Sequence, residues 1–154
     1  MCSSDLPAAF ERVDRAADAA PQPNNFAPNA AELGKHGRRL VGTTGLSCIA
    51  CHNFAGNKSL GVPALDLATT GQRLQWDWFR RYLLDPASLR PGTRMPPFWP
   101  GGVAVNKDVL AGNTEQQIAA IWFYLARKNF TDLPVGLVQG KMEIVATNEA
   151  VVYR

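Results

Sequence analysis

Apolar residues recur with the spacing of an α-helix in three stretches of the chain. The first stretch follows Asn29, a residue suited to cap a helix that begins near Ala30. One buried face is predicted along this helix, formed by Leu33, Gly37, Leu40 and Val41. We expect the helix to end at Gly42, shortly before a pair of cysteines.

The second helix is predicted over residues 72–84, where Leu74, Trp78 and Tyr82 recur every four residues. Its opposite face carries the polar residues Arg73, Asp77, Arg80 and Arg81. Asp85-Pro86 is expected to end this helix, because the residue before a proline disfavours the helical conformation.

The third helix is predicted to be capped by Asn113 or Thr114 and to end around Asn129. Its apolar stripe is formed by Ile118, Ile121, Trp122 and Leu125. Residues 86–100, before this helix, are rich in proline, and each proline removes a backbone donor. We therefore expect a rigid, irregular loop there.

The two ends of the chain show different patterns. Residues 8–20 have the pattern of a short helix, and an extended linker is predicted from there to Pro28. After Pro134 apolar and polar residues alternate, as is typical of a strand, and a second strand-like run begins at Val151. An isolated pair of strands is marginally stable in water, so we expect these residues to belong to a larger sheet.

The composition fits one domain with a packed core. The 154 residues are 46% hydrophobic and 19% charged, and 11 prolines with 13 glycines indicate many fixed loops. The chain lacks the run of about 18 apolar residues that a membrane helix requires. The predicted fold class is all-α, with an irregular N-terminal extension at residues 1–29, a helical domain at 30–130 and a short β-like tail at 131–154.

The strongest chemical signal is the motif Cys48-Ile49-Ala50-Cys51-His52. Two thiols three positions apart can add to the two vinyl groups on one edge of a porphyrin, and the adjacent histidine then lies under the iron. Chance occurrence in a chain of this length is on the order of one in a thousand. We therefore expect one covalently bound haem, attached through Cys48 and Cys51, with His52 as an axial ligand of the iron.

Two other kinds of site use the same cysteines. A closed zinc site needs four protein ligands, and His36 is the only other histidine in the chain. A thioredoxin-like pair opens a helix after a strand, whereas the flanks here are predicted to be helix and loop. The sequence favours haem, with zinc, thiol redox chemistry and chance as the alternatives.

Met95 is the candidate for the second axial ligand. It lies in a loop with several prolines, residues 90–97, which can hold a thioether against iron with little loss of chain entropy. A plain hydrophobic contact is the alternative role. The competing ligands are His36, expected to be a solvated surface residue, and Met142, expected to pack in the strand-like tail.

Together these features resemble a class I cytochrome c domain over roughly residues 30 to 130. The resemblance is carried by Gly37 on the first helix, the CxxCH motif, Pro63 and Leu65 after it, the loop at residues 91–96 and an aromatic final helix. In that family the first and last helices cross at a glycine, a proline carbonyl accepts a hydrogen bond from the axial histidine, and a loop methionine completes the coordination of iron.

The resemblance implies a cytochrome c fold of three to five helices around the haem. The contacts that it implies are Gly37 against the Ile121 to Leu125 face, Pro63 behind His52, and Met95 on the iron. Trp78 and Tyr82 resemble family aromatic residues near the haem edge or propionates, with plain core packing as the alternative for each.

Positive charge is concentrated around the motif. Between Lys35 and Arg94 there are nine basic and three acidic residues, a net charge of +6, and the remainder of the chain carries −3. This asymmetry can steer an acidic redox partner toward the haem edge. Alternatively, some of the arginines pair with the haem propionates, and Arg94 is counted among the cofactor-binding candidates. Nucleic acid is not an expected partner, because no nucleic-acid-binding motif accompanies these residues.

Electron transfer with both axial positions filled is the predicted function, and the chain itself is not expected to be an enzyme. A haem enzyme or gas-binding sensor is the first alternative, and it requires an open position on the iron with a polar group above it. The sequence offers no distal histidine once His52 is used. A second alternative is a docking module of a larger dehydrogenase.

Haem is attached to such motifs in the periplasm or elsewhere outside the cytoplasm, yet residues 1–20 contain four acidic residues and no apolar signal-peptide core. The chain also ends within the strand-like run at residues 151–153. We therefore expect a fragment of a longer exported protein. This arrangement is similar to the haem domain of large multidomain bacterial redox proteins, in which a β-rich region follows the cytochrome.

Overall fold

The computed structural model describes residues 22–137 and two short strands, β1 (Ala146–Thr147) and β2 (Ala150–Val151). Apart from these strands, the regular structure within the described residues is helical, which confirms the predicted all-α class. None of the described helices is long and apolar enough to cross a membrane. The predicted helix at residues 8–20 and the candidate Met142 lie outside the described residues.

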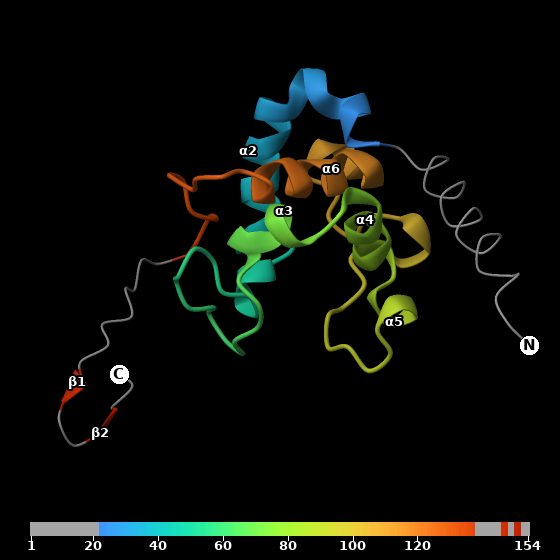
Figure 1. Ribbon diagram of the computed structural model, residues 1–154. Helices are drawn as coiled ribbons and strands as arrows, with labels where there is room; N and C mark the ends of the chain where they lie inside the picture. Colours follow the sequence, from blue (N-terminus) through green and yellow to red (C-terminus); the bar gives the residue numbers. More distant parts are fainter. Residues whose placement is uncertain (1–21, 138–145, 148–149, 152–154) are drawn as a thin grey trace, which may run out of the picture.

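Two twelve-residue helices form the centre of the fold, α2 (Ala30–Val41) and α6 (Thr114–Leu125) (Figure 1). Both were predicted, although α6 ends at Leu125 rather than near Asn129. The Asn113 side chain caps α6 by accepting a hydrogen bond from the Gln116 backbone N–H at 3.0 Å. The expected cap of α2 is wrong, because the Asn29 side chain makes no such bond.

Gly37 lies where α2 crosses α6. A Cβ atom at this position would overlap the carbonyl group of Ala120 and lie 2.8 Å from the Tyr124 Cβ. Only a residue without a side chain allows the two backbones to approach this closely. The crossing predicted at Gly37 is confirmed, and it falls on Ala120 and Tyr124.

The helix predicted over residues 72–84 is two helices, α3 (Thr70–Arg73) and α4 (Trp76–Leu84). Leu74 and Gln75 are extended, with ψ angles of 148° at both, and they interrupt the helical hydrogen bonding. The single helix with one face along Leu74, Trp78 and Tyr82 is therefore wrong, although Leu74 packs against the core.

The face of α4 that is buried contains Trp76, Phe79 and Leu83. Both aromatic rings of this face contact Trp122 of α6, with centroid distances of 5.8 Å from Trp76 and 5.2 Å from Phe79. Packing on Trp122 thus decides which side of α4 faces inward. A bidentate ion pair at 2.6 and 2.8 Å between Arg80 and Glu115 also joins α4 to α6.

The proline-rich segment is less irregular than expected, because α5 (Pro86–Leu89) opens it. Pro86 takes the first helical position, where its missing N–H has no helical partner to lose. The Asp85 side chain accepts a hydrogen bond from the Ser88 backbone N–H at 3.2 Å. Two further short 3₁₀ turns follow along the chain, η4 (Pro100–Gly102) and η5 (Leu110–Gly112).

Residues on both sides of the helical unit pack against it. The predicted extended linker is wrong at η1 (Pro23–Asn29), a 3₁₀ helix that precedes α2 directly. At the other end, the Arg38 Nε donates to the Leu133 carbonyl at 2.6 Å and the Thr43 N–H donates to the Val135 carbonyl at 2.9 Å. The packed unit thus extends beyond residue 130. β1 and β2 pair antiparallel, with Ala146 opposite Val151.

We expect Gly37→Ala to reduce the free energy of unfolding by about 2 kcal/mol or more, because the added methyl group meets backbone that cannot move aside. Denaturant titration of the two proteins measures this difference. Gly34→Ala is the matched control on the same helix, since its new Cβ would meet only the flexible Arg127 guanidinium and alanine favours the helix by about 1 kcal/mol. Equal losses in the two variants would contradict the assigned crossing.

Candidate functional site

The CxxCH motif forms one turn of helix, which α2 precedes with the turn at residues 42–47 between them. It begins at η2 (Cys48–Ala50), and the Cys48 carbonyl accepts hydrogen bonds from the backbone N–H groups of Cys51 at 3.2 Å and His52 at 2.9 Å. Residues three and four positions apart on a helical turn lie on the same side of it. The turn therefore presents both thiols and the imidazole together, and both thiols are free.

Two buried apolar side chains fasten this turn to the core. Ile49, within the motif, and Phe54, just after it, are both fully buried. The Phe54 ring stacks on Tyr124 of α6 at a centroid distance of 5.6 Å and meets the edge of Phe130 at 4.8 Å. Cys51 and His52 are thus held between two anchored positions.

A hydrogen bond of 2.9 Å between the His52 Nδ1 and the Leu65 carbonyl oxygen fixes the imidazole. A carbonyl oxygen can only accept, so Nδ1 carries the hydrogen and Nε2 keeps a free lone pair. This is the arrangement of a histidine prepared to bind a metal through Nε2.

The carbonyl implied by the resemblance, that of Pro63, is not the partner of His52. Ala64 pairs with His52 in a parallel bridge, and its N–H donates to the Cys51 carbonyl at 2.6 Å. This pairing brings the carbonyl of the following residue, Leu65, to the ring. Pro63 itself is exposed.

Asp66 organises the loop that supplies this carbonyl, a role that we did not predict. Its carboxylate accepts three backbone hydrogen bonds at 2.8 to 2.9 Å, from Ala55, Gly56 and Ala68. Asp66 is also the N-cap of the short helix η3 (Leu67–Thr69). The sequence feature that could have indicated this role is an aspartate directly before a helical turn, where it can act as an N-cap.

Met95 lies on the second loop of the site, between α5 and η4. Its side chain is partly buried and packs against the apolar core. The Met95 N–H donates to the Thr93 Oγ1 at 3.2 Å, and the same oxygen hydrogen-bonds the Tyr82 hydroxyl at 3.2 Å. Thr93 thus ties the loop around Met95 at residues 90–97, here called the methionine loop, to α4. This role of Thr93 was not predicted.

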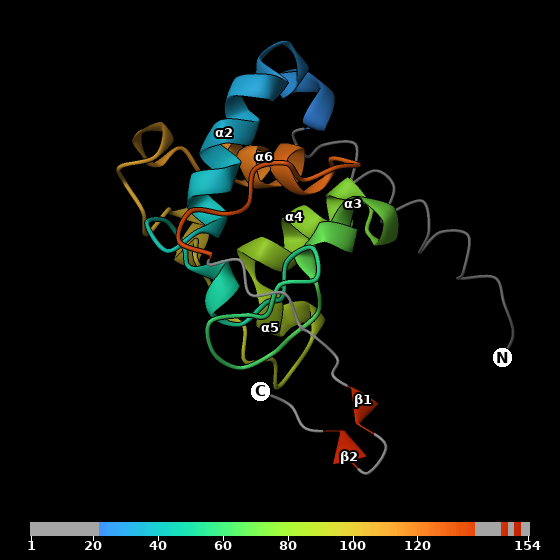
Figure 2. The ribbon, with the colours of Figure 1, turned by 90° about the vertical axis from the view of Figure 1, so that its left-hand side faces the viewer.

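The loop that follows the CxxCH motif and the loop that carries Met95 extend from the same side of the α2 and α6 pair (Figures 1 and 2). Of the other predicted residues, Tyr82 is joined to the methionine loop through Thr93. Trp78 is 38% exposed and stacks on Tyr82, so it is not packed in the core. Arg94 is exposed, with no ion-pair partner among the described residues.

The surroundings of the cysteines can be compared with the two alternative sites, a thioredoxin-like pair and a closed zinc site. Burial raises the pKa of the Cys48 thiol to about 12, whereas a redox-active thiol needs a lowered pKa. The described residues contain no group of three or more His, Cys, Asp or Glu side chains placed to hold a metal. Within the described residues, the burial of Cys48 therefore does not favour a thioredoxin-like pair, and the surroundings of the cysteines supply no further ligands for a closed zinc site.

Gln117 of α6 holds the segment that follows Met95, and it too was missed. Its fully buried amide accepts a hydrogen bond from the Trp99 Nε1 at 3.1 Å and donates to the carbonyls of Asn106 at 2.8 Å and Val109 at 2.7 Å. Because Trp99 lies four residues after Met95, this amide fixes one end of the methionine loop to the helix. A single glutamine next to the apolar stripe of α6 does not indicate in the sequence that its amide holds a distant loop.

Gln117→Leu is expected to destabilise the protein by about 2 to 3 kcal/mol, because three polar groups lose their partner, two of them in buried hydrogen bonds. Amide hydrogen exchange should increase first in residues 98–110, and mass spectrometry of peptides measures it. Gln116→Leu, at an exposed position of the same helix, is the control. Unchanged exchange in residues 98–110 would show that the amide does not hold this segment.

Comparison with known protein families, curated proteins and solved structures gives no match to this chain. Any functional assignment therefore depends on the motif, the contacts of its residues and the arrangement of the two loops.

Proposed function

We propose that this chain is a mono-haem c-type cytochrome domain that transfers single electrons. The observation that carries the proposal is the CxxCH turn in which His52 donates Nδ1–H to the Leu65 carbonyl and keeps Nε2 free. The crossing at Gly37, with the motif following the first helix, supports a cytochrome c fold.

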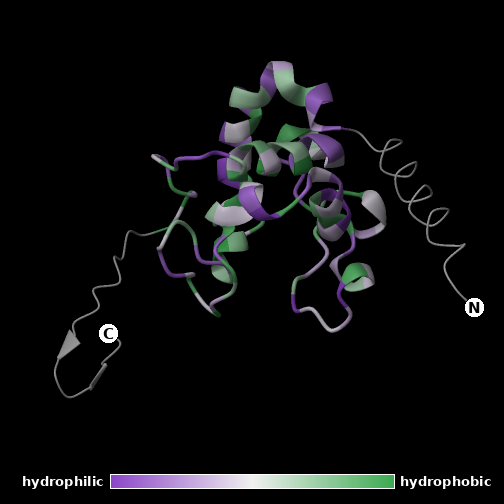
Figure 3. Ribbon diagram, in the orientation of Figure 1, coloured by the Kyte–Doolittle hydropathy of each residue, from purple (hydrophilic) through white to green (hydrophobic). Residues whose placement is uncertain are grey.

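The residues around the motif suit a large flat apolar group. Leu60, Val62 and Leu65 are 51%, 60% and 64% exposed within one short loop. A cluster of exposed apolar side chains marks a site for a ligand or partner. Hydrophobic stretches also occur in the loops on the side of α2 and α6 where the motif lies (Figure 3).

Each residue of the proposed site has a defined task. Cys48 and Cys51 would form the two thioether bonds, and His52 would bind iron through Nε2. The Leu65 carbonyl keeps the imidazole oriented, and Asp66 keeps the loop that carries this carbonyl in place. When bound, the haem supplies an iron that alternates between the ferric and ferrous states.

Met95 is the proposed second axial ligand. The Thr93 hydroxyl and the fixed φ angles of Pro96 and Pro97 restrict the loop around it, so little chain entropy remains to be lost on coordination. A thioether ligand stabilises ferrous iron and so raises the reduction potential. With both axial positions filled, the domain serves electron transfer rather than catalysis at the iron.

We further propose that the domain works outside the cytoplasm, in the periplasm, as part of a larger redox protein. Covalent haem attachment to such a motif takes place there. A haem enzyme or gas-binding sensor with an open axial position remains the alternative function, and carbon monoxide binding distinguishes the two.

The protein matured with haem should keep its colour after acid-acetone extraction, because thioether bonds survive this treatment. Cys48→Ser/Cys51→Ser should lose the haem on extraction, whereas each single variant retains one bond. The absorption spectrum in alkaline pyridine counts the vinyl groups that have reacted. Free haem released from wild-type protein would refute covalent attachment.

Met95→Ala should lower the reduction potential, because the soft ligand that favours ferrous iron is removed. The reduced variant should also bind carbon monoxide faster and more tightly than the wild type. The control variants His36→Ala and Met142→Ala remove the two competing ligands and should keep the wild-type potential. Loss of the methionine-to-iron absorption band in Met142→Ala, or a changed potential in His36→Ala, with Met95→Ala unaltered, would assign the second axial ligand elsewhere.

A further inference from the structure

Trp78 and Tyr82 form an aromatic pair on the outer side of α4. They are four residues apart, and their rings stack with centroids 4.7 Å apart and an interplanar angle of 13°. Trp78 is 38% exposed, although the rest of the aromatic side chains of α4, Trp76 and Phe79, are buried. The stack therefore offers a preorganised aromatic surface, and tryptophan and tyrosine are the residues that most often dominate binding at protein interfaces.

This surface is joined to the proposed iron site by a short series of contacts. Trp78 stacks on Tyr82, the Tyr82 hydroxyl hydrogen-bonds the Thr93 Oγ1 at 3.2 Å, and that oxygen accepts the Met95 N–H at 3.2 Å. Electronic coupling falls steeply across empty gaps, so stacked and hydrogen-bonded contacts favour tunnelling. A redox partner bound at Trp78 would thus have good electronic coupling to the methionine loop.

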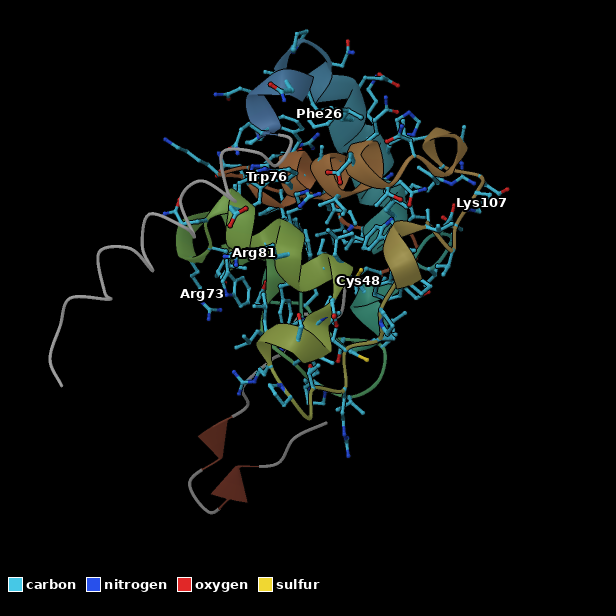
Figure 4. All side chains as sticks on the ribbon, turned by 90° about the vertical axis from the view of Figure 1, so that its right-hand side faces the viewer. Phe26, Cys48, Arg73, Trp76, Arg81 and Lys107 are labelled. Atoms are coloured by element: carbon cyan, nitrogen blue, oxygen red, sulfur yellow. The ribbon has the colours of Figure 1, made fainter. Side chains whose placement is uncertain are left out.

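The charge around the pair is positive. Arg81 is three residues from Trp78 on the same helix, and Arg94 directly follows Thr93. Arg73 and Arg81 lie on the α3 and α4 face, whereas Lys107 lies at the opposite edge of the view (Figure 4). Arg81 pairs with Asp77, but Arg73 and Arg94 have no ion-pair partner among the described residues. An exposed tryptophan on a segment that also carries unpaired arginines suits an acidic protein surface.

We propose that the face of α4 centred on Trp78, with Arg73, Arg81 and Arg94 around it, docks an acidic one-electron redox protein. The inference rests on the proposed haem function and names its partner surface. In the docked complex one electron would leave the reduced centre of the partner, which would be oxidised, and would reduce the ferric iron of the bound haem to ferrous. No bond is made or broken and no proton moves.

The test measures binding apart from electron transfer. The haem-loaded protein is titrated with a zinc-substituted acidic type 1 copper protein, whose zinc has no redox activity. Backbone amide shifts measured by NMR give the affinity of every variant, and in the wild type the indole N–H resonance of Trp78 is followed as well. This resonance should shift on binding, and affinity should fall as salt rises because exposed charges are screened. Trp78→Ala should weaken binding by at least about tenfold, whereas Trp78→Phe, which keeps an aromatic ring, should lose about threefold or less.

Arg94→Gln should weaken binding at low ionic strength, and this difference should disappear at high salt. The matched controls are Val103→Ala, an apolar side chain that is 57% exposed, and Lys107→Gln, a cation away from this face. Both should bind within about twofold of the wild type. With the copper form of the probe, the rate of electron transfer should fall in parallel with the affinity of each variant.

Docking at Trp78 is overturned if Trp78→Ala binds like the wild type, if either control weakens binding as much, or if the wild type does not bind at low salt. Covalent haem is verified by absorption before each titration. A failure of the haem proposal is therefore seen before, and separately from, a failure of docking.

Discussion

The close approach of α2 and α6 at Gly37 is the contact on which the rest of the structure depends. Because glycine lets the two backbones touch at Ala120, the side chains around the crossing interlock and leave a fixed frame. The CxxCH turn follows α2 after the short turn at residues 42–47, and Phe54 fastens it to α6 through Tyr124. The position of the chemical motif is therefore set by helix packing.

The sequence predicted what depends on local pattern. Both central helices and the Asn113 cap follow from spacing and residue type, and the structure confirms them. Spacing placed Gly37 on the buried face of the first helix, whereas the crossing at this glycine was implied by the resemblance, and the structure confirms it. The break at Leu74 and Gln75 was not predictable in this way, because contact of Trp76 and Phe79 with Trp122 decides the buried face of α4. Tertiary packing there outweighs a regular four-residue spacing.

The candidate site shows the same division. Cys48, Cys51 and His52 share one turn as their spacing predicts, whereas the partner of His52 lies two residues beyond the proline that the resemblance implied. Loop carbonyls are positioned by hydrogen bonds that have no periodic signature, such as those of Asp66. Gln117 likewise acts through three partners that are distant or irregular in sequence.

The crossing also has a consequence for the order in which the chain opens. Gly37 and Ala120 lie near opposite ends of the described unit, so their contact closes one long loop that contains the motif, the methionine loop and α4. Closing such a loop is entropically costly, but further lengthening adds little to that cost. Separation of α2 from α6 therefore removes the support of every enclosed segment at once. We therefore expect the site and its frame to behave as a single cooperative unit, whose central amides exchange with solvent only when the whole unit unfolds.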